Sequence, residues 1–153
     1  MVQLDGACHC GTITLHVQLA SPAGSYTPRA CDCDFCSKHG ASYVSDPQGS
    51  VRITVAESGR LNRYRQGSQT AEFLLCAHCG VLLGVQYQES GLLYLSINSR
   101  VLDNTPPFPP PQSASPKLLS LQEKTQRWKA LWFRDCTLQL PEHDSSNQTE
   151  NTA

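Results

Sequence analysis

The chain has 153 residues, a length that fits one domain of ordinary size. Charged residues make up 16% and the formal net charge is −1, so the composition argues against the highly charged kind of disorder for the body of the chain. The sequence shows neither the roughly 18 apolar residues of a membrane helix nor the basic start and apolar run of a secretory signal. We therefore expect a cytoplasmic protein that does not cross a membrane.

The first two thirds of the chain read as a series of short strands. Residues 12–19 alternate cleanly, because Ile13, Leu15, Val17 and Leu19 share one face of a half-buried strand. Short apolar runs bounded by turn residues predict further strands over residues 25–30, 41–45, 51–57, 61–65, 71–76, 81–87 and 92–98. This pattern predicts a mostly β fold built from antiparallel sheets.

The last third is different in composition. Residues 104–116 contain six of the ten prolines, so we expect an extended surface connection without regular structure. Ser115 and Pro116 are suited to begin a helix over residues 117–133, packed on the sheet. Apolar side chains recur there at roughly helical spacing, at Leu118, Leu121, Trp128, Leu131 and Trp132. From residue 141 to residue 153 the chain is polar and acidic, which predicts a disordered tail.

Eight cysteines in a reducing compartment call for a metal or redox explanation. Seven of them are clustered, as C-x-C at 8 and 10, C-x-C-x-x-C at 31, 33 and 36, and C-x-x-C at 76 and 79. Cys136 stands alone and is interpreted as a free thiol. Seven clustered thiols fit a division into four and three, because structural zinc takes four ligands whereas catalytic zinc typically takes three and keeps one position open.

The glycines suggest how the seven thiols divide. Glycine follows Cys10 and Cys79, whereas serine follows Cys36. A turn that wraps a metal aims backbone N–H groups at the thiolates, and glycine tolerates the positive φ that such a turn often needs. We therefore expect two zinc ions per chain, a structural one held by Cys8, Cys10, Cys76 and Cys79 and an open catalytic one held by Cys31, Cys33 and Cys36.

Three other interpretations of the cysteines stay open at this point. The thiols would form disulfides if the protein were secreted. Cys76 and Cys79 would form a redox dithiol if a thioredoxin-like βαβ pattern surrounded them. A single zinc with four thiolates would leave the other three clustered cysteines merely buried.

Three segments carry a resemblance to a known family. Residues 6–11 read Gly-Ala-Cys-His-Cys-Gly, residues 31–36 read Cys-Asp-Cys-Asp-Phe-Cys, and residues 73–80 read Phe-Leu-Leu-Cys-Ala-His-Cys-Gly. In order, spacing and flanking glycines they resemble the three motifs of the glutathione-dependent formaldehyde-activating enzyme family, which also includes centromere protein V. The resemblance covers about residues 3–103, the motif core of one domain that we place at residues 1–140.

The resemblance implies a tent-like arrangement of antiparallel sheets around a structural zinc held by the first and third motifs. The central motif implies a second zinc, at which the thiol substrate binds. The family's best-known reaction adds glutathione to formaldehyde, and its reverse breaks a carbon–sulfur bond, so such enzymes are classed as carbon–sulfur lyases. Asp34 stands where many relatives carry serine, and the proline-rich segment and the helix with Trp128 and Trp132 match the family only loosely. We expect these two regions to help shape the substrate pocket.

An open zinc site of this kind suggests a mechanism. A substrate thiol in the fourth position would lose its proton more easily and attack an aldehyde carbon. The developing alkoxide then needs a proton donor, and His39 and Lys38 are the nearest candidates in sequence. Glutathione carries two carboxylates, for which Arg29, Lys38 and Arg52 are the nearest basic residues.

The main alternative is a zinc-binding scaffold or interaction module without catalysis. Nucleic acid is an improbable partner, because ionised thiols make the net charge more negative even with two zinc ions bound, and phosphate binding needs a basic face. Arg60, Arg63 and Arg65 form a small cluster that we interpret as a solvated strand edge.

Overall fold

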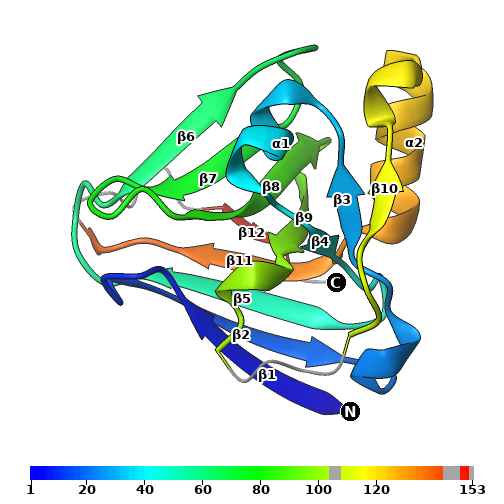
Figure 1. Cartoon of the computed structure of the whole chain (residues 1–153). Helices are drawn as coiled ribbons and strands as arrows, with labels where there is room; N and C mark the ends of the chain where they lie inside the picture. Colours follow the sequence, from blue (N-terminus) through cyan, green and yellow to red (C-terminus); the bar gives the residue numbers. More distant parts are fainter. Residues whose placement is uncertain (104–107, 143–148, 152–153) are drawn as a thin grey trace.

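A computed structural model of the protein describes residues 1–103, 108–142 and 149–151, which form two β-sheets and two α-helices (Figure 1). The mostly β class predicted from the sequence is therefore confirmed. The five-stranded sheet runs in the spatial order β1 (Val2–Ala7), β2 (Ile13–Leu19), β5 (Ser50–Val55), β11 (Asp135–Gln139) and β12 (Thr149–Asn151). The seven-stranded sheet runs β10 (Gln112–Ala114), β3 (Arg29–Cys31), β4 (Tyr43–Val44), β9 (Leu92–Asn98), β8 (Leu82–Glu89), β7 (Glu72–Cys76) and β6 (Leu61–Arg65).

Most neighbouring strands are antiparallel, as predicted, but two pairs are parallel. Strand β10 lies parallel to β3, and β11 lies parallel to β5. Both parallel strands come from the C-terminal third of the chain, which returns to an edge of one sheet and to the middle of the other. Parallel neighbours cannot be joined by a tight turn, so local turn signals in the sequence gave no indication of these two pairs.

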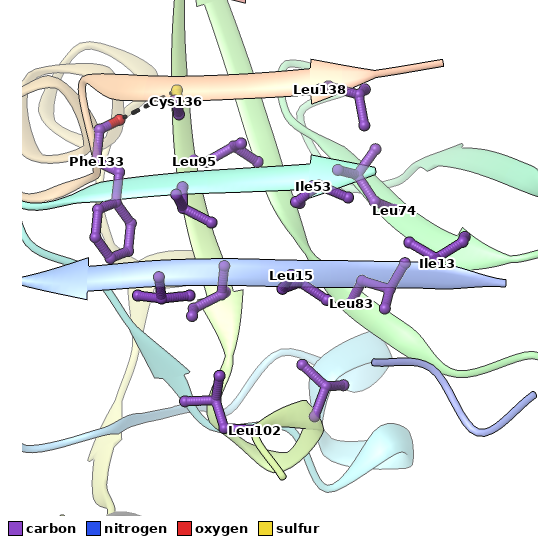
Figure 2. Packing of buried hydrophobic residues seen from close by; sticks show 14 of the residues in the cluster. Ile13, Leu15, Ile53, Leu74, Leu83, Leu95, Leu102, Phe133, Cys136 and Leu138 are labelled. Carbon is purple, nitrogen blue, oxygen red and sulfur yellow. Dashed lines mark hydrogen bonds between the residues drawn. The ribbon is translucent and has the colours of Figure 1, made fainter. Parts of the chain in front are cut away.

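The main hydrophobic core fills the space between the sheets. Every second residue of β2 points into it, since Ile13, Leu15, Val17 and Leu19 are all at most 1% exposed. Figure 2 shows how side chains from both sheets meet there, among them Ile53 and Leu138 from the five-stranded sheet and Leu74, Leu83 and Leu95 from the seven-stranded sheet. Cys136 lies in the same core, as a buried thiol whose sulfur donates to the Leu93 carbonyl at 3.2 Å.

The other face of the seven-stranded sheet is also covered. Residues 82–87 of β8 are all buried, so both faces of this part of the strand are covered. The cover comes from the helices α1 (Asp34–His39) and α2 (Leu121–Leu131), which lie beside the sheet in Figure 1. A second, more aromatic cluster packs between them and the sheet, and includes Phe73, Tyr94 and Trp132.

Helix α2 is shorter than the helix predicted over residues 117–133. Pro116–Leu118 forms a separate 3-10 turn, and Ser120 then caps α2 in a reciprocal pair of hydrogen bonds with Glu123. Ser115, expected to cap the helix, instead donates its hydroxyl to Asp32. The helix ends before Phe133 because that residue exchanges two backbone hydrogen bonds with Leu95 of β9 and is fully buried in the core.

The proline-rich segment was expected to lack regular structure, and the structure corrects this expectation. Residues 112–114 form β10, which extends the seven-stranded sheet alongside β3. Residues 104–107 lie outside the described part of the chain. The strand predicted over residues 25–30 is also wrong in part, because Ala23–Ser25 forms a 3-10 turn and β3 begins only at Arg29.

The predicted disordered tail contains a strand. Residues 149–151 form β12 and pair with β11, whereas residues 143–148 and 152–153 lie outside the described residues. The division of the chain into a domain and a tail stays a prediction. Within the described residues, no helix has both the length and the apolar character needed to cross a membrane.

Candidate functional site

Four of the cysteines form a cluster that joins the two sheets. Cys8 and Cys10 lie in the turn between β1 and β2, whereas Cys76 ends β7 and Cys79 lies in the turn that leads to β8. The four sulfur atoms all lie within 4.8 Å of one another, and Cys10 and Cys76, from different sheets, are 3.7 Å apart. Four thiols converging in this way could hold a metal ion in a closed site.

The two turns of this cluster have the same local design. In each, the glycine N–H donates to the carbonyl of the first cysteine, from Gly11 to Cys8 at 3.1 Å and from Gly80 to Cys76 at 2.9 Å. Both glycines have φ = 81°, in the left-handed region that L side chains rarely adopt. The positive φ expected after Cys10 and Cys79 is therefore present, and it explains why glycine occupies both positions.

In the four-cysteine cluster, the exposed thiol of Cys10 ionises more readily than the buried thiol of Cys8. Hydrogen bonding from Thr12 lowers the pKa of Cys10 to about 6, while burial raises the pKa of Cys8 to about 11. The cluster therefore holds at least one thiolate near neutral pH. Thiolates are the form in which cysteine binds metals, so this environment is suited to a metal ion.

The other three clustered cysteines lie together at the junction of β3 and α1. Cys31 ends β3, Cys33 caps the start of α1, and Cys36 lies within the helix; their sulfurs lie within 4.8 Å of one another. The Cys33 sulfur accepts a hydrogen bond from the Cys36 N–H at 3.4 Å. The sequence analysis assigned no helix here, although Asp34 in the first turn and Gly40 just after the last were signals for one.

Neighbouring side chains fix the three-cysteine cluster in place. The Tyr43 hydroxyl lies 3.1 Å from the Cys36 sulfur, and the Gln66 amide donates to Cys33 at 3.8 Å. A hydrogen bond from Cys36 lowers the pKa of Cys31 to about 6, and the same contact together with burial raises the pKa of Cys36. Burial also raises the pKa of Tyr43, so its hydroxyl stays neutral and can act as a hydrogen-bond donor.

A cavity of about 170 Å³ opens directly onto the three-cysteine cluster. Cys31, Cys33 and Cys36 form part of its wall, and residues 66–68, in the turn between β6 and β7, form another part. Residues of helix α2 also line the cavity. None of the four cysteines of the other cluster lines this cavity, so only the three-cysteine cluster is accessible to a ligand held there.

Four basic side chains line the same cavity, namely Arg29, Lys117, Lys124 and Arg127. Arg29 is half-buried and donates to the Ser45 hydroxyl at 2.6 Å, and its pKa is lowered by burial and by the nearby Arg127. Lys117 lies 4.0 Å from the Asp32 carboxylate. Among the described residues, no carboxylate lies within ion-pair distance of Arg29, Lys124 or Arg127, so the cavity has an uncompensated positive wall.

The structure places the other predicted site residues differently. His39 is exposed and packs its ring against Phe35 with the centroids 4.7 Å apart, and neither it nor Lys38 lines the cavity. The prediction of His39 as a proton donor is therefore not supported by its position. Arg52 lies on β5, on the outer face of the five-stranded sheet, away from the cysteines. Of the basic residues predicted near the open site, only Arg29 reaches the cavity.

The arginines near β6 lie at the edge of the seven-stranded sheet and make ion pairs. Arg60 lies 3.0 Å from Glu57, and Arg63 and Arg65 lie 3.9 and 3.4 Å from Glu72. Two carboxylates thus offset part of the positive charge of the three arginines, in agreement with the interpretation of this cluster as a solvated strand edge.

Helix α2 supplies the cavity residues that the sequence analysis did not assign. Lys124, Arg127, Trp128 and Leu131 all line the cavity. Their spacing of i, i+3, i+4 and i+7 places them on one helix face. The expectation that this helix helps to shape the substrate pocket agrees with its place in the cavity wall, but the sequence did not indicate that Lys124 and Arg127 would line it.

With this geometry in place, comparison with known proteins identifies the family. Residues 3–119 match the family described as glutathione-dependent formaldehyde-activating enzyme, and the chain belongs to this family. A crystal structure of a Rhodobacter sphaeroides protein is similar in fold, with a TM-score of 0.51 and 27% sequence identity, covering 68% of this chain and 92% of that chain. No curated protein matches the sequence.

Proposed function

We propose that this protein is a zinc-dependent enzyme of the carbon–sulfur lyase type, acting on the adduct of a small acidic thiol such as glutathione and an aldehyde. The observation that carries the proposal is the cavity itself. It brings three clustered thiols and a wall of uncompensated positive charge to the same cavity. A scaffold without catalysis has no evident use for such a combination.

The cysteine clusters fit two zinc ions per chain. Sulfur ligands suit zinc, and sets of four and three ligands are typical of structural and catalytic zinc sites respectively. Cys8, Cys10, Cys76 and Cys79 would hold the structural ion, and Cys31, Cys33 and Cys36 would hold the catalytic one. When bound at the three-cysteine site, zinc would lower the pKa of a substrate thiol and so supply a nucleophile at neutral pH. Clusters of reduced thiols are also consistent with a cytoplasmic location.

The cavity walls would bind and orient the thiol substrate. Glutathione carries two carboxylates, and Arg29 and Arg127 offer guanidinium groups that bind carboxylates through paired hydrogen bonds. Lys124 adds a third cation on the same side. The partial burial of Arg29 strengthens such an interaction, because charges attract more strongly away from water. Tyr43 and Gln66 would hold Cys36 and Cys33 while the substrate binds.

The proposed reaction forms and breaks one carbon–sulfur bond. The thiol sulfur attacks the aldehyde carbon, the carbonyl π electrons move to oxygen, and the proton that leaves the thiol balances the one that the oxygen gains. The reverse reaction returns thiol and aldehyde. The apolar side chains around the cysteines would limit the access of water to the reacting carbon, which favours the thiol over water as the nucleophile.

The proposal is tested by measuring aldehyde-dependent consumption of glutathione, with formaldehyde as the first aldehyde and the spontaneous reaction subtracted. We expect activity in the wild type and in Cys136→Ala, which removes a thiol that belongs to neither cluster. Cys33→Ser should lower the rate at least 100-fold. If no rate exceeds the background across several thiols and aldehydes, the proposal is wrong and an interaction module is the better interpretation.

A further inference from the structure

The face of α2 that lines the cavity has two chemically different halves. Lys124 and Arg127 form its N-terminal half, and Trp128 and Leu131 form its C-terminal half. A helix rises about 1.5 Å per residue, so Lys124 and Leu131 are separated by about 10 Å along the axis. Trp132, directly after the helix, continues the apolar half. A ligand lying along this face would therefore meet positive charge at one end and aromatic surface at the other.

The apolar half lies beside the three cysteines. Trp132, Phe73 and Val85 belong to the same buried cluster as Cys36, and Trp128, Leu131, Cys31 and Cys33 pack against that cluster. All of these side chains except the cysteines form a continuous apolar wall. A group attached to a sulfur atom held at the three-cysteine site would thus lie against this wall.

The aromatic side chains of the wall are held in place by one another. Trp128 and Trp132 stack with their ring centroids 5.1 Å apart, and Trp128 also packs edge-on against Tyr87 at 5.3 Å. Trp132 is only 7% exposed. Because the rings pack against one another, they form a rigid apolar surface before any ligand binds.

We infer that the cavity prefers an adduct whose carbonyl-derived part is a hydrocarbon group of several carbons or an aromatic ring over one that carries only the single carbon of formaldehyde. This inference rests on the proposed function and specifies its substrate class. The peptide part of an acidic thiol such as glutathione is polar and charged, so it belongs on the basic half of α2. The aromatic half is then left to the carbonyl partner, and each buried methylene strengthens binding about fourfold. Trp128 and Trp132 are the residues that determine this specificity.

The two tryptophans make the inference directly testable. They are the only tryptophans of the sequence, and both line the cavity, so intrinsic fluorescence reports on its occupancy. Zinc-loaded protein is titrated with glutathione and with S-methyl-, S-butyl-, S-hexyl- and S-benzylglutathione, stable thioethers that stand in for adducts of increasing size. Isothermal titration calorimetry provides a second readout that does not depend on the tryptophans.

We expect the dissociation constant to fall stepwise from the methyl to the hexyl derivative, by at least tenfold in total. Trp128→Ala should abolish most of this gain while leaving the affinity for glutathione within about threefold. Trp128→Phe should keep part of the gain in affinity from the methyl to the hexyl derivative, because it retains an aromatic ring. This variant also controls for a loss of helix packing in Trp128→Ala. Leu121→Ala, which truncates an exposed apolar residue of the same helix outside the cavity, should keep the full gain.

Two results would overturn the inference, and they are distinguishable. If glutathione binds but the hexyl and benzyl derivatives bind no better than the methyl one, or if the gain survives Trp128→Ala, the substrate class is wrong while the proposed function stands. If neither glutathione nor any thioether binds, the proposed function fails as well.

Discussion

The two cysteine clusters share their chemistry and differ in what surrounds them. The four-cysteine cluster joins a turn of each sheet, and none of its sulfurs lines the cavity at the other cluster. The three-cysteine cluster is built from one continuous segment, β3 and α1, and opens onto a cavity with a positive and an aromatic wall. We therefore propose that the cluster which ties distant segments together contributes to folding, whereas the local cluster beside the cavity binds a ligand.

The largest effect is expected when one cysteine of each cluster is replaced by serine, which tests whether the two clusters have different roles. Cys79→Ser should destabilise the whole domain by several kcal/mol, because structural zinc contributes on the order of 10 kcal/mol of folding free energy. Cys33→Ser should leave the fold nearly as stable as the wild type and lose only one metal ion. Thermal melts followed by circular dichroism measure both effects.

Cys136→Ala is the matched control for these variants, since it removes a buried thiol from the core without touching either cluster. It should retain the full metal content even if its melting temperature falls. Equal destabilisation of Cys79→Ser and Cys33→Ser would show that the two clusters do not have the different roles assigned to them.

The next largest effect is expected at the positive wall of the cavity. Arg127→Gln should raise the KM for glutathione about tenfold, because it would remove the proposed charge-assisted contact to a substrate carboxylate. Lys129→Gln is the control, since Lys129 lies on the same helix but pairs with Glu89 at 2.7 Å and does not line the cavity. Steady-state kinetics at constant ionic strength should show a normal KM for this variant. A similar KM for all three proteins would exclude Arg127 from substrate binding.

A smaller effect is expected from the glycines of the four-cysteine cluster. Gly80→Ala should cost about 1 kcal/mol of stability, because an alanine at φ = 81° is strained. Gly91→Ala imposes the same strain at φ = 79° in the turn between β8 and β9, far in sequence from any cluster cysteine. Both variants should melt earlier, but only Gly80→Ala should release its structural metal more readily to a chelator. Identical metal retention would mean that the turn tolerates the change without affecting the sulfurs.

The smallest effect concerns a residue that belongs to neither cluster. Burial alone would raise the pKa of Asp46, but hydrogen bonds from the Ala20 N–H, the Tyr26 hydroxyl and the Gln48 N–H outweigh it and hold the pKa below the ordinary 3.8. The carboxylate therefore contributes stability above pH 3.8 that is lost as the pH falls through the lower, folded-state pKa. Asp46→Asn should cost roughly 0.5 to 1 kcal/mol near pH 7.

The same variant should flatten the loss of stability below pH 4, as measured by urea denaturation at a series of pH values. Asp103→Asn, at an exposed position, should behave like the wild type. If Asp46→Asn loses stability below pH 4 as steeply as the wild type does, this carboxylate is not responsible for the acid-induced loss of stability. Neither variant should change the metal content, in contrast to the cysteine variants.

The sequence predicted best what depends on local pattern. The alternation in residues 13–19 and the short apolar runs located β2, β6 and β9 almost to the residue, and the glycines after Cys10 and Cys79 indicated which thiols belong together. These features are encoded within a few residues of each other. The mostly β fold followed from them.

What the sequence did not predict depends on contacts between distant segments. β10 forms because residues 112–114 reach the edge of β3, and β11 forms because Cys136 and Leu138 enter the core beside β5. The assignment of His39 relied on closeness in sequence, whereas the cavity is completed by Arg127 and Trp128 from a helix about ninety residues further on. No local pattern carries such information.

Native mass spectrometry of the untagged protein, counting zinc per chain before and after glutathione is added, gives the sharpest test of an open zinc site at the three-cysteine cluster. We predict two zinc ions, with glutathione either adding to the metal-loaded chain or removing one ion only. Cys33→Ser should then carry one zinc that glutathione does not affect. A wild-type chain with a single zinc that glutathione leaves unchanged would contradict the assignment of the three-cysteine cluster as an open, substrate-binding centre.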